Sequence, residues 1–259
     1  MIVFLNGQFI EENEAALPVT DRGFTLGDGV FDTMLAAGGA LIDAEAHFAR
    51  LIGHAAVLRI PVSMNVEDFK NAANQLIASS SRHPLAVRTA ISRGVGERGL
   101  APPDNAQPTI LMRASPAPDQ AKMPPPRLII AQGVRRNEHS PLCRIKSSNY
   151  GDNILALLEA KDNSADDSIM LNTAGNAACA TASNIFVQIG GVLFTPPLPD
   201  GAMDGITRRK LLSRAHEKSL CAEDLLNAEA IYLTNSILGV RAAAALNGIA
   251  LKKLTPLAA

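Results

Sequence analysis

A proline-rich segment in the middle of the chain limits most strongly how this sequence can fold. Residues 115–126 read SPAPDQAKMPPP and contain five prolines in twelve residues. Proline lacks a backbone N–H and has a fixed φ, so this segment is excluded from helices and from central strands. We therefore expect an interdomain linker at 115–126, a small N-terminal domain over residues 1–114 and a second domain over residues 127–259.

On both sides of this linker, the apolar pattern predicts short strands mixed with a few helices. The Asn6-Gly7 pair between two apolar runs predicts a tight β-hairpin. Three- and four-residue apolar spacing predicts four helices, at 43–58 with Asp43 as its cap, and at 66–78, 149–161 and 207–218. The expected strands are 2–5, 8–10, 85–93, 109–114, 127–132, 167–171, 183–190, 192–195 and 230–234. Few long helices separate these strands, which indicates an α+β fold rather than a doubly wound parallel sheet.

Composition excludes several classes of function. The chain has 24 Lys+Arg against 25 Asp+Glu, a net charge of -1, so a diffuse attraction to nucleic acid or to a membrane surface is not expected. No apolar run approaches the ~18 residues of a membrane span, and the N-terminus turns polar early, so we expect a cytoplasmic protein. Three cysteines without a CxxC pair and five histidines without HExxH argue against a metal site.

Lys146 is the candidate nucleophile among the eight lysines. It follows an apolar, strand-like segment at 142–145 and precedes Ser147-Ser148-Asn149-Tyr150. A lysine between apolar residues and a tyrosine can lose solvent, which makes its amine a better nucleophile toward carbonyls. From this context alone, a structural or surface lysine stays an open alternative.

Six motifs stand in order along the chain: DRGFTLGDGVFDT (21–33), HFARL (47–51), IKSSNYGDNILALLEAK (145–161), ASNIF (182–186), GITR (205–208) and TNS (234–236). Together they resemble the class IV, fold-type IV pyridoxal-phosphate enzymes, which include D-amino-acid and branched-chain aminotransferases and 4-amino-4-deoxychorismate lyases. The resemblance covers residues 4–240. It implies pyridoxal 5'-phosphate as cofactor, a small N-terminal α/β domain, a larger C-terminal pseudo-barrel domain, a small amino-acid-like substrate and a homodimer.

The resemblance also implies roles for single residues. Lys146 matches the lysine that holds the cofactor covalently and then moves the substrate α-proton. Arg50 matches an arginine that binds the cofactor phosphate, the alternative being a solvent-facing helix residue. Ile206 and Thr207 match a pair that holds the same phosphate at the start of a helix. The other implied cofactor-binding residues are Tyr150, Ser183, Met203, Asn235 and Ser236. A half-buried helix position is the alternative for the tyrosine, and a core position for the methionine.

One position departs from the family pattern. The family has a glutamate four residues after a glycine, and its carboxylate keeps the pyridine nitrogen of the cofactor protonated. Counting from Gly175, this chain has Cys179 there, and no acidic residue occurs from 171 to 190. A thiol with an ordinary pKa near 8.5 is mostly neutral, so we expect a weaker electron sink. Either the reaction depends less on this nitrogen, or another acid replaces the glutamate, or catalysis is weak.

Three further runs resemble the lyases within the family: Phe31-Asp32-Thr33, ISRGVGERG (91–99) and TNSILGV (234–240). The resemblance places Phe31 and Thr33 near the substrate. Arg88 and Arg98 could bind substrate carboxylates through their planar guanidinium groups, the alternative being strand-edge and loop surface charge. These runs favour 4-amino-4-deoxychorismate lyase, which gives 4-aminobenzoate and pyruvate. A D-amino-acid or branched-chain aminotransferase, and a cofactor-binding homologue with weakened catalysis, are the alternatives.

Overall fold

The computed structural model describes residues 1–252 and residue 257, and its chain divides into two units. Unit 1 comprises Met1–Pro118 and Ile145–Asn149, and unit 2 comprises Asp119–Arg144 and Tyr150–Ala259. The short segment Ile145–Asn149 therefore joins the first unit, although the sequence placed it in the second domain. The final residues of the expected 127–259 domain, 253–256 and 258–259, lie outside the described part.

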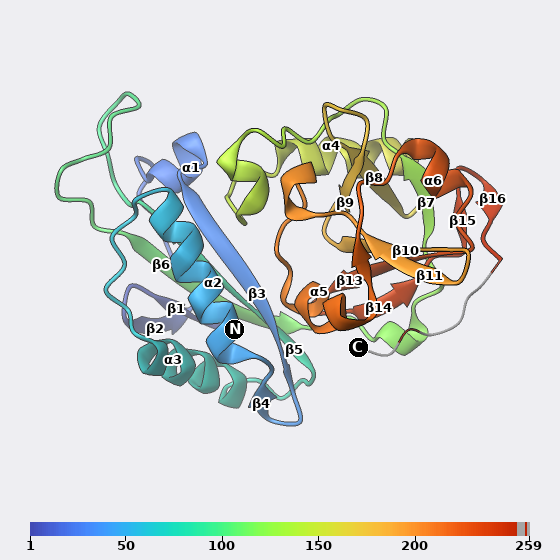
Figure 1. The fold of residues 1–259 in the computed structure, drawn as a ribbon. Helices are drawn as coiled ribbons and strands as arrows, with labels where there is room; N and C mark the ends of the chain where they lie inside the picture. Colours follow the sequence, from blue (N-terminus) through green and yellow to red (C-terminus); the bar gives the residue numbers. More distant parts are fainter. Residues whose placement is uncertain (253–256, 258–259) are drawn as a thin grey trace. The chain divides into compact units, whose positions relative to one another are not determined.

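Unit 1 is a six-stranded antiparallel sheet with two long helices, α2 and α3, on one face (Figure 1). The strand order is β2-β1-β6-β5-β3-β4. The strands are β1 (Ile2–Leu5), β2 (Gln8–Glu11), β3 (Gly29–Ala37), β4 (Ala40–Leu41), β5 (Leu85–Ser92) and β6 (Thr109–Pro116), and the helices are α1 (Arg22–Leu26), α2 (Ala44–Val57) and α3 (Val66–Ala78). Because β6 extends to Pro116, the expected linker begins as strand, and a 3-10 turn at Gln120–Lys122 follows within it.

Local sequence explains the element boundaries of unit 1. Asn6 and Gly7 have φ values of 49° and 89°, which is the type I′ geometry expected for the hairpin between β1 and β2. The predicted cap at Asp43 is wrong. Asp43 has φ 55°, outside the extended region a capping residue needs, and its side chain makes no capping hydrogen bond with α2. Asn65 caps α3, where its side chain accepts a hydrogen bond from the Asp68 N–H.

Unit 2 contains two five-stranded sheets that share one apolar core. One sheet has the order β12-β11-β10-β13-β14 and the other β16-β15-β7-β8-β9. The strands are β7 (Arg127–Ile130), β8 (Asp167–Leu171), β9 (Ala177–Ala180), β10 (Asn184–Ile189), β11 (Val192–Thr195), β12 (His216–Glu217), β13 (Ala230–Asn235), β14 (Gly239–Ala242), β15 (Ala245–Leu246) and β16 (Ile249–Ala250). Ile169 and Leu171 from one sheet pack in the same core as Ile185 and Leu233 from the other. The predicted α+β class is confirmed.

The helices of unit 2 are α4 (Gly151–Asp162), α5 (Ile206–Leu211) and α6 (Ala222–Leu226). The predicted helix at 207–218 is too long, because a 3-10 turn at Leu212–Arg214 ends it and His216–Glu217 pairs with the edge of β11. The predicted strand-like segment at 142–145 is instead mostly a 3-10 turn, Pro141–Arg144. In α4 the small side chains of Ala156 and Ala160 are buried against the sheet, whereas the larger leucines and isoleucine of this helix are mostly exposed.

Candidate active site

Lys146 lies beside β3 in unit 1. Its carbonyl accepts a hydrogen bond from the Phe31 N–H at 2.8 Å, and its own N–H donates to Nδ1 of His54 on α2 at 3.1 Å. The Ser148 N–H donates to the Gly29 carbonyl at 2.8 Å, so the segment after Lys146 extends the pairing along the free edge of β3. Backbone contacts on both sides therefore fix the position from which the half-buried lysine side chain projects.

Two cations lie over the ring of Phe31. The Arg88 guanidinium carbon is 3.6 Å from the ring centroid, and the Lys146 ammonium is 4.6 Å from it. Arg88 on β5 is the direct partner of Thr33 on β3, so their side chains project from the same face of the sheet. Phe31 lies two residues before Thr33 and shares that face. The structure thus brings together four of the predicted residues: the lysine, the phenylalanine, the threonine and one arginine.

Arg50 is held by a buried ion pair. Its Nε and Nη2 atoms donate to the two carboxylate oxygens of Asp32 at 2.7 and 2.8 Å, and Arg50 is only 8% exposed. Nδ1 of His47 lies 2.8 Å from the same carboxylate. Burial raises the pKa of the Asp32 carboxyl, but the hydrogen bonds from His47 and Arg50 outweigh it and hold this pKa well below its usual range. Asp32 therefore stays charged and orients Arg50.

Sequence reasoning missed the roles of Asp32, His47 and His54, although a signal for the two histidines exists. His47, Arg50 and His54 are spaced by three and four residues, which places them on one face of α2. That face is the one turned toward β3 and the lysine segment, as the contacts of all three side chains show. A polar stripe on an otherwise apolar helix face is the pattern that could have identified them.

Arg98 lies exposed in the loop between β5 and β6, and Arg22 anchors this loop. The Arg22 guanidinium donates to the carbonyls of Gly99, Leu100 and Ala101 at 3.1, 2.9 and 3.2 Å. Its Nε donates to Asp28 at 2.9 Å, and Arg93 donates to the same carboxylate at 2.7 and 3.0 Å. Arg98 therefore stands on a loop of fixed backbone position.

In unit 2, three of the motifs meet at the ends of β10 and β13. Asn184 pairs with Thr234 across the two strands, and its side-chain amide donates to the Met203 carbonyl at 2.7 Å. The Asn235 side-chain amide donates to Oγ of Ser183 at 3.1 Å. The Asn235 Oδ1 atom accepts from the backbone N–H groups of residues 237 and 238, which builds a turn around Ser236. The predicted residues Ser183, Met203, Asn235 and Ser236 thus lie in one assembly at these strand ends, which two side-chain hydrogen bonds and one turn hold in place.

Gly205 sets the position of Ile206 and Thr207 in the same assembly. A Cβ atom on Gly205 would lie 2.1 Å from Oδ1 of Asn184, so only glycine permits this approach. Ile206 and Thr207 begin α5, where the first backbone N–H groups have no partner within the helix. Oγ1 of Thr234, next to Asn235, is buried without a hydrogen-bond partner in the described structure. Unfilled donors and a glycine-dependent approach suit a phosphate group.

The remaining predicted residues of unit 2 are Tyr150 and Cys179. Tyr150 is half-buried at the N-terminus of α4. Cys179 is buried on β9 opposite Met170 of β8, and burial raises the pKa of its thiol. For the pyridoxal phosphate that the resemblance implies, unit 1 taken by itself offers an amine at Lys146 and a buried guanidinium at Arg50, and unit 2 taken by itself offers backbone donors at the start of α5. The position expected to face the pyridine nitrogen of this cofactor does not fit the usual pattern, because it offers no carboxylate.

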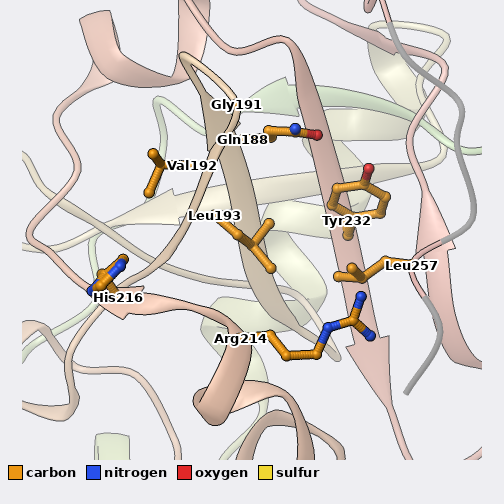
Figure 2. Close-up of a pocket in the computed structure, with 8 residues that line it drawn as sticks. All are labelled: Gln188, Gly191, Val192, Leu193, Arg214, His216, Tyr232 and Leu257. Carbon is orange, nitrogen blue, oxygen red and sulfur yellow. The ribbon is translucent and has the colours of Figure 1, made fainter.

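Unit 2 also has a pocket that contains none of the predicted site residues. It has a volume of about 280 Å³ and opens over β10, β11 and β13 (Figure 2). Its lining residues are Gln188, Gly191, Val192, Leu193, Arg214, His216, Tyr232 and Leu257. Within residues 1–252 and 257, no group of three or more His, Cys, Asp or Glu side chains could hold a metal ion, and no helix is long and apolar enough to cross a membrane.

The fold and these two groups of residues define a fold-type IV enzyme of the pyridoxal-phosphate class. Residues 29–246 match the model of the class IV amino-transferases, and the chain belongs to this family, whose cofactor is pyridoxal 5'-phosphate. The chain is therefore a pyridoxal-phosphate-dependent aminotransferase or lyase.

Individual relatives carry different activities in their names. A Methanocaldococcus jannaschii protein provisionally named a branched-chain-amino-acid aminotransferase is 31% identical over 91% of this chain and 84% of its own length. The aminodeoxychorismate lyase of Bacillus subtilis is 27% identical over 92% of this chain and 84% of its own. The crystal structure of a branched-chain aminotransferase from Thermoproteus uzoniensis with norvaline superimposes with a TM-score of 0.91 at 25% identity, covering 99% of this chain and 90% of that one.

Proposed function

We propose that this protein is a 4-amino-4-deoxychorismate lyase that releases pyruvate and 4-aminobenzoate. The observation that carries the proposal is the group of Phe31, Thr33, Arg88 and Lys146 in unit 1, where a guanidinium lies over the same aromatic ring as the lysine ammonium. A substrate with carboxylates beside a ring needs a cation held close to the group that takes its α-proton. The similarity to the lyase of Bacillus subtilis supports the same choice.

The residues would then act as follows. When bound, pyridoxal phosphate supplies the electron sink for the carbanion that forms at the α-carbon. Lys146 Nζ takes the α-proton and Arg88 pairs with a substrate carboxylate. The electron pair left by the α-proton would form a ring double bond as the C–O ether bond breaks, so that the ring of the substrate becomes aromatic, which supplies driving force. The leaving group departs as enolpyruvate and takes up a proton to become pyruvate. Within unit 1, the ion pair with Asp32 uses Nε and Nη2 of Arg50 and leaves its Nη1 group to pair with an anion. Within unit 2, the backbone N–H groups of Ile206 and Thr207 would hold a phosphate at the start of α5.

A homodimer is part of this proposal. On α4, the side chains of Ile154 and Leu155 are each 56% exposed and Leu158 is 48% exposed, on adjacent turns of the helix. Exposed apolar side chains at such spacing are typical of a helix face that another protein covers. We expect light scattering to give twice the mass of one chain, and Leu155→Glu to shift the protein toward a single chain.

The activity is tested by offering the purified holoenzyme two kinds of substrate. With 4-amino-4-deoxychorismate, we expect pyruvate release that Lys146→Ala abolishes. With a panel of D- and L-amino acids, a lyase leaves the cofactor absorbance unchanged, whereas an aminotransferase converts it to the pyridoxamine form. Conversion without pyruvate release would identify an aminotransferase. A lysine-dependent cofactor band with neither reaction would identify a binding protein with weakened catalysis.

Arg113 provides the matched control for a test of Arg88. The two arginines are direct cross-strand partners on β5 and β6, but Arg113 is paired with Glu12 at 2.7 Å and lies half exposed. We expect Arg88→Met to lower kcat/KM by roughly 10- to 100-fold, the equivalent of losing a charge-assisted contact of about 1.5–3 kcal/mol. Arg113→Met is expected to leave kcat/KM within about twofold. Equal losses in both variants would contradict the assignment of Arg88.

A further inference from the structure

Cys179 and Arg136 lie on the same face of the β16-β15-β7-β8-β9 sheet. Cys179 is opposite Met170 in the pairing of β9 with β8, and Arg136 forms an isolated parallel bridge with Asn172, the residue that follows β8. The register of β8 and β9 shifts between Met170 and Leu171, but the extra residue, Ala178, is on β9, so the side chains along β8 keep their alternation. Met170 and Asn172 are two residues apart, so their side chains project to one face. Residues that are paired directly across neighbouring strands point to the same face of the sheet, so Cys179 shares the face of Met170, and Arg136 shares the face of Asn172. The thiol and the guanidinium therefore project to one face.

Arg136 is fixed in place without a carboxylate partner. Its N–H donates to the Leu171 carbonyl at 2.8 Å, and its guanidinium donates to the carbonyls of Cys143 and Gly201. A Cβ atom on Gly201 would lie 3.1 Å from Cγ of Arg136, so this glycine fits against the arginine stem. Among the described residues, no carboxylate lies within ion-pair distance of Arg136. Its positive charge is therefore not neutralised locally.

Cys179 presents a neutral group. The residue is 6% exposed and packs with Ala131, Ala156, Met170 and Ala178. Burial raises the pKa of the thiol, and the charge of Arg136 opposes this shift without reversing it. A protonated thiol is a weak hydrogen-bond donor and carries no negative charge.

No acid of β8 takes the place of the missing carboxylate on this face. Asp167 lies three residues before Met170 and projects from the opposite face, although its charge still acts on the Cys179 thiol and adds to the rise in the thiol pKa. Its Oδ1 atom accepts hydrogen bonds from the Thr181 hydroxyl at 2.6 Å and from the Ser168 N–H at 2.8 Å. The acid that remains to be tested is Asp200, whose carbonyl accepts from the Asn172 side chain and whose Oδ2 atom is buried without a partner in the described part of the chain.

We propose that Cys179 and Arg136 keep the pyridine nitrogen of the bound cofactor unprotonated. The inference rests on the proposed function, because it takes the cofactor and the family position of residue 179 as given. A neutral donor gives the nitrogen no negative partner, and a nearby cation disfavours a second positive charge. The cofactor in this protein then withdraws electrons less strongly than one paired with glutamate. A reaction with its own driving force, such as one that forms an aromatic ring, depends least on electron withdrawal by the cofactor.

The protonation state is measured by nitrogen NMR of the holoenzyme loaded with pyridoxal phosphate that carries ¹⁵N in the ring. We expect the wild-type resonance at the position of an unprotonated pyridine. Cys179→Glu is expected to move it to the protonated position, and Cys179→Ser, which keeps a neutral donor, is expected to leave it in place. Arg136→Gln is expected to move the resonance toward the protonated position, and Arg136→Lys, which keeps the charge, serves as its matched control.

Each outcome decides the matter. A protonated nitrogen in the wild type overturns the inference but leaves the proposed function intact, and a return to the unprotonated position in Asp200→Asn would then identify Asp200 as the acid. A Cys179→Glu resonance that stays at the unprotonated position also overturns it. Failure of the wild type to bind the labelled cofactor overturns both the inference and the proposed function. Circular dichroism of each variant confirms that an unchanged resonance comes from a folded protein.

Discussion

At the scale of single residues, the charged groups of unit 1 are arranged to hold one another. Asp32 accepts hydrogen bonds from Arg50 and contacts His47, and all three side chains are buried. A buried carboxylate between two potential cations is stable only as a complete group, because removal of one charge leaves the others unpaired in a medium of low dielectric constant. This group therefore couples the stability of unit 1 to the orientation of Arg50.

Asp32→Asn tests this coupling. The substitution keeps the shape of the side chain but removes its charge, so we expect the free energy of unfolding to fall by about 3 kcal/mol. We also expect the Kd for pyridoxal phosphate to rise roughly 10-fold, because Arg50 loses its bidentate partner. Urea unfolding and fluorescence titration measure the two effects. Asp104→Asn, at an exposed loop position, is the control and should change stability by less than about 0.5 kcal/mol. Unchanged cofactor affinity in Asp32→Asn would exclude a positioning role.

At the scale of elements, the contact between Gly205 and Asn184 joins the start of α5 to the start of β10. Gly205→Ala is expected to lower the free energy of unfolding by about 1–3 kcal/mol, because the added methyl group would overlap Oδ1 of Asn184. It should also weaken binding of inorganic phosphate and of the cofactor. Gly53→Ala in α2 meets nothing within 4 Å and is the matched control, with stability unchanged or raised by up to about 1 kcal/mol. Similar losses in both variants would mean that the Gly205 contact is not specific.

Asp28 accepts hydrogen bonds from Arg22 of α1 and from Arg93, the residue after β5. These ion pairs make the stability of unit 1 sensitive to acid. Burial raises the pKa of Asp28, but hydrogen bonds from Arg93 and Arg22 outweigh it, so this pKa lies below the unfolded value near 3.8. A lowered folded pKa contributes stability that is present above the unfolded pKa and is lost as the pH falls through the folded one. We expect Asp28→Asn to be less stable than the wild type at pH 7, and this difference to shrink below about pH 4. Urea unfolding at several pH values measures it, and a difference independent of pH would contradict the linkage.

Sequence patterns were sufficient for elements whose environment is local. The Asn6-Gly7 hairpin, the α3 helix and the strands β8 and β11 follow from turn chemistry and apolar spacing, and their predicted bounds agree with the structure to within one residue. The predictions for 207–218 and 142–145 failed because pairing with a distant strand and a short 3-10 turn leave no periodic signal. In α4, periodicity found an apolar face but could not show that the alanines, rather than the leucines, face the sheet.

For the candidate site, too, local motifs predicted single residues, whereas contacts between residues far apart in the sequence were not predictable. Motif order predicted Lys146 and the residues of the two groups, since motifs are local. The ion pair of Arg50 with Asp32, and the contact of His54 with the lysine segment, join residues 18 and 92 positions apart. Only the folded backbone reveals such pairs, and a resemblance to a family indicates which residues gather without showing what each one contacts.

At the scale of the whole molecule, unit 1 is not continuous in sequence. Ile145 is 5% exposed and packs in the core of unit 1, although more than twenty-five residues separate it from Pro118. The chain therefore completes its first unit only after part of the second has been made. Both the position of Lys146, the proposed catalytic lysine, and a core side chain depend on this returning segment.

Ile145→Ala measures this dependence. We expect a loss of about 2–5 kcal/mol in the free energy of unfolding, because a buried isoleucine is replaced by a cavity. Ile249→Ala, at an exposed position of β16, is the matched control and should change the free energy of unfolding by less than about 0.5 kcal/mol. Chemical denaturation of both variants gives the comparison. A small effect at Ile145 would show that the returning segment is not needed for the core of unit 1.

The anchoring of the 94–108 loop by Arg22 has a consequence for how this protein can change. Arg22 contacts three successive carbonyl oxygens, and every amino acid supplies the same carbonyl group. The identity of the side chain at Leu100, which is 83% exposed, does not enter these contacts. New side chains can therefore be sampled at this position, in nature or in a library, while the backbone that carries them keeps its course. The side chain at position 100 and the backbone geometry of the loop are in this way separately heritable.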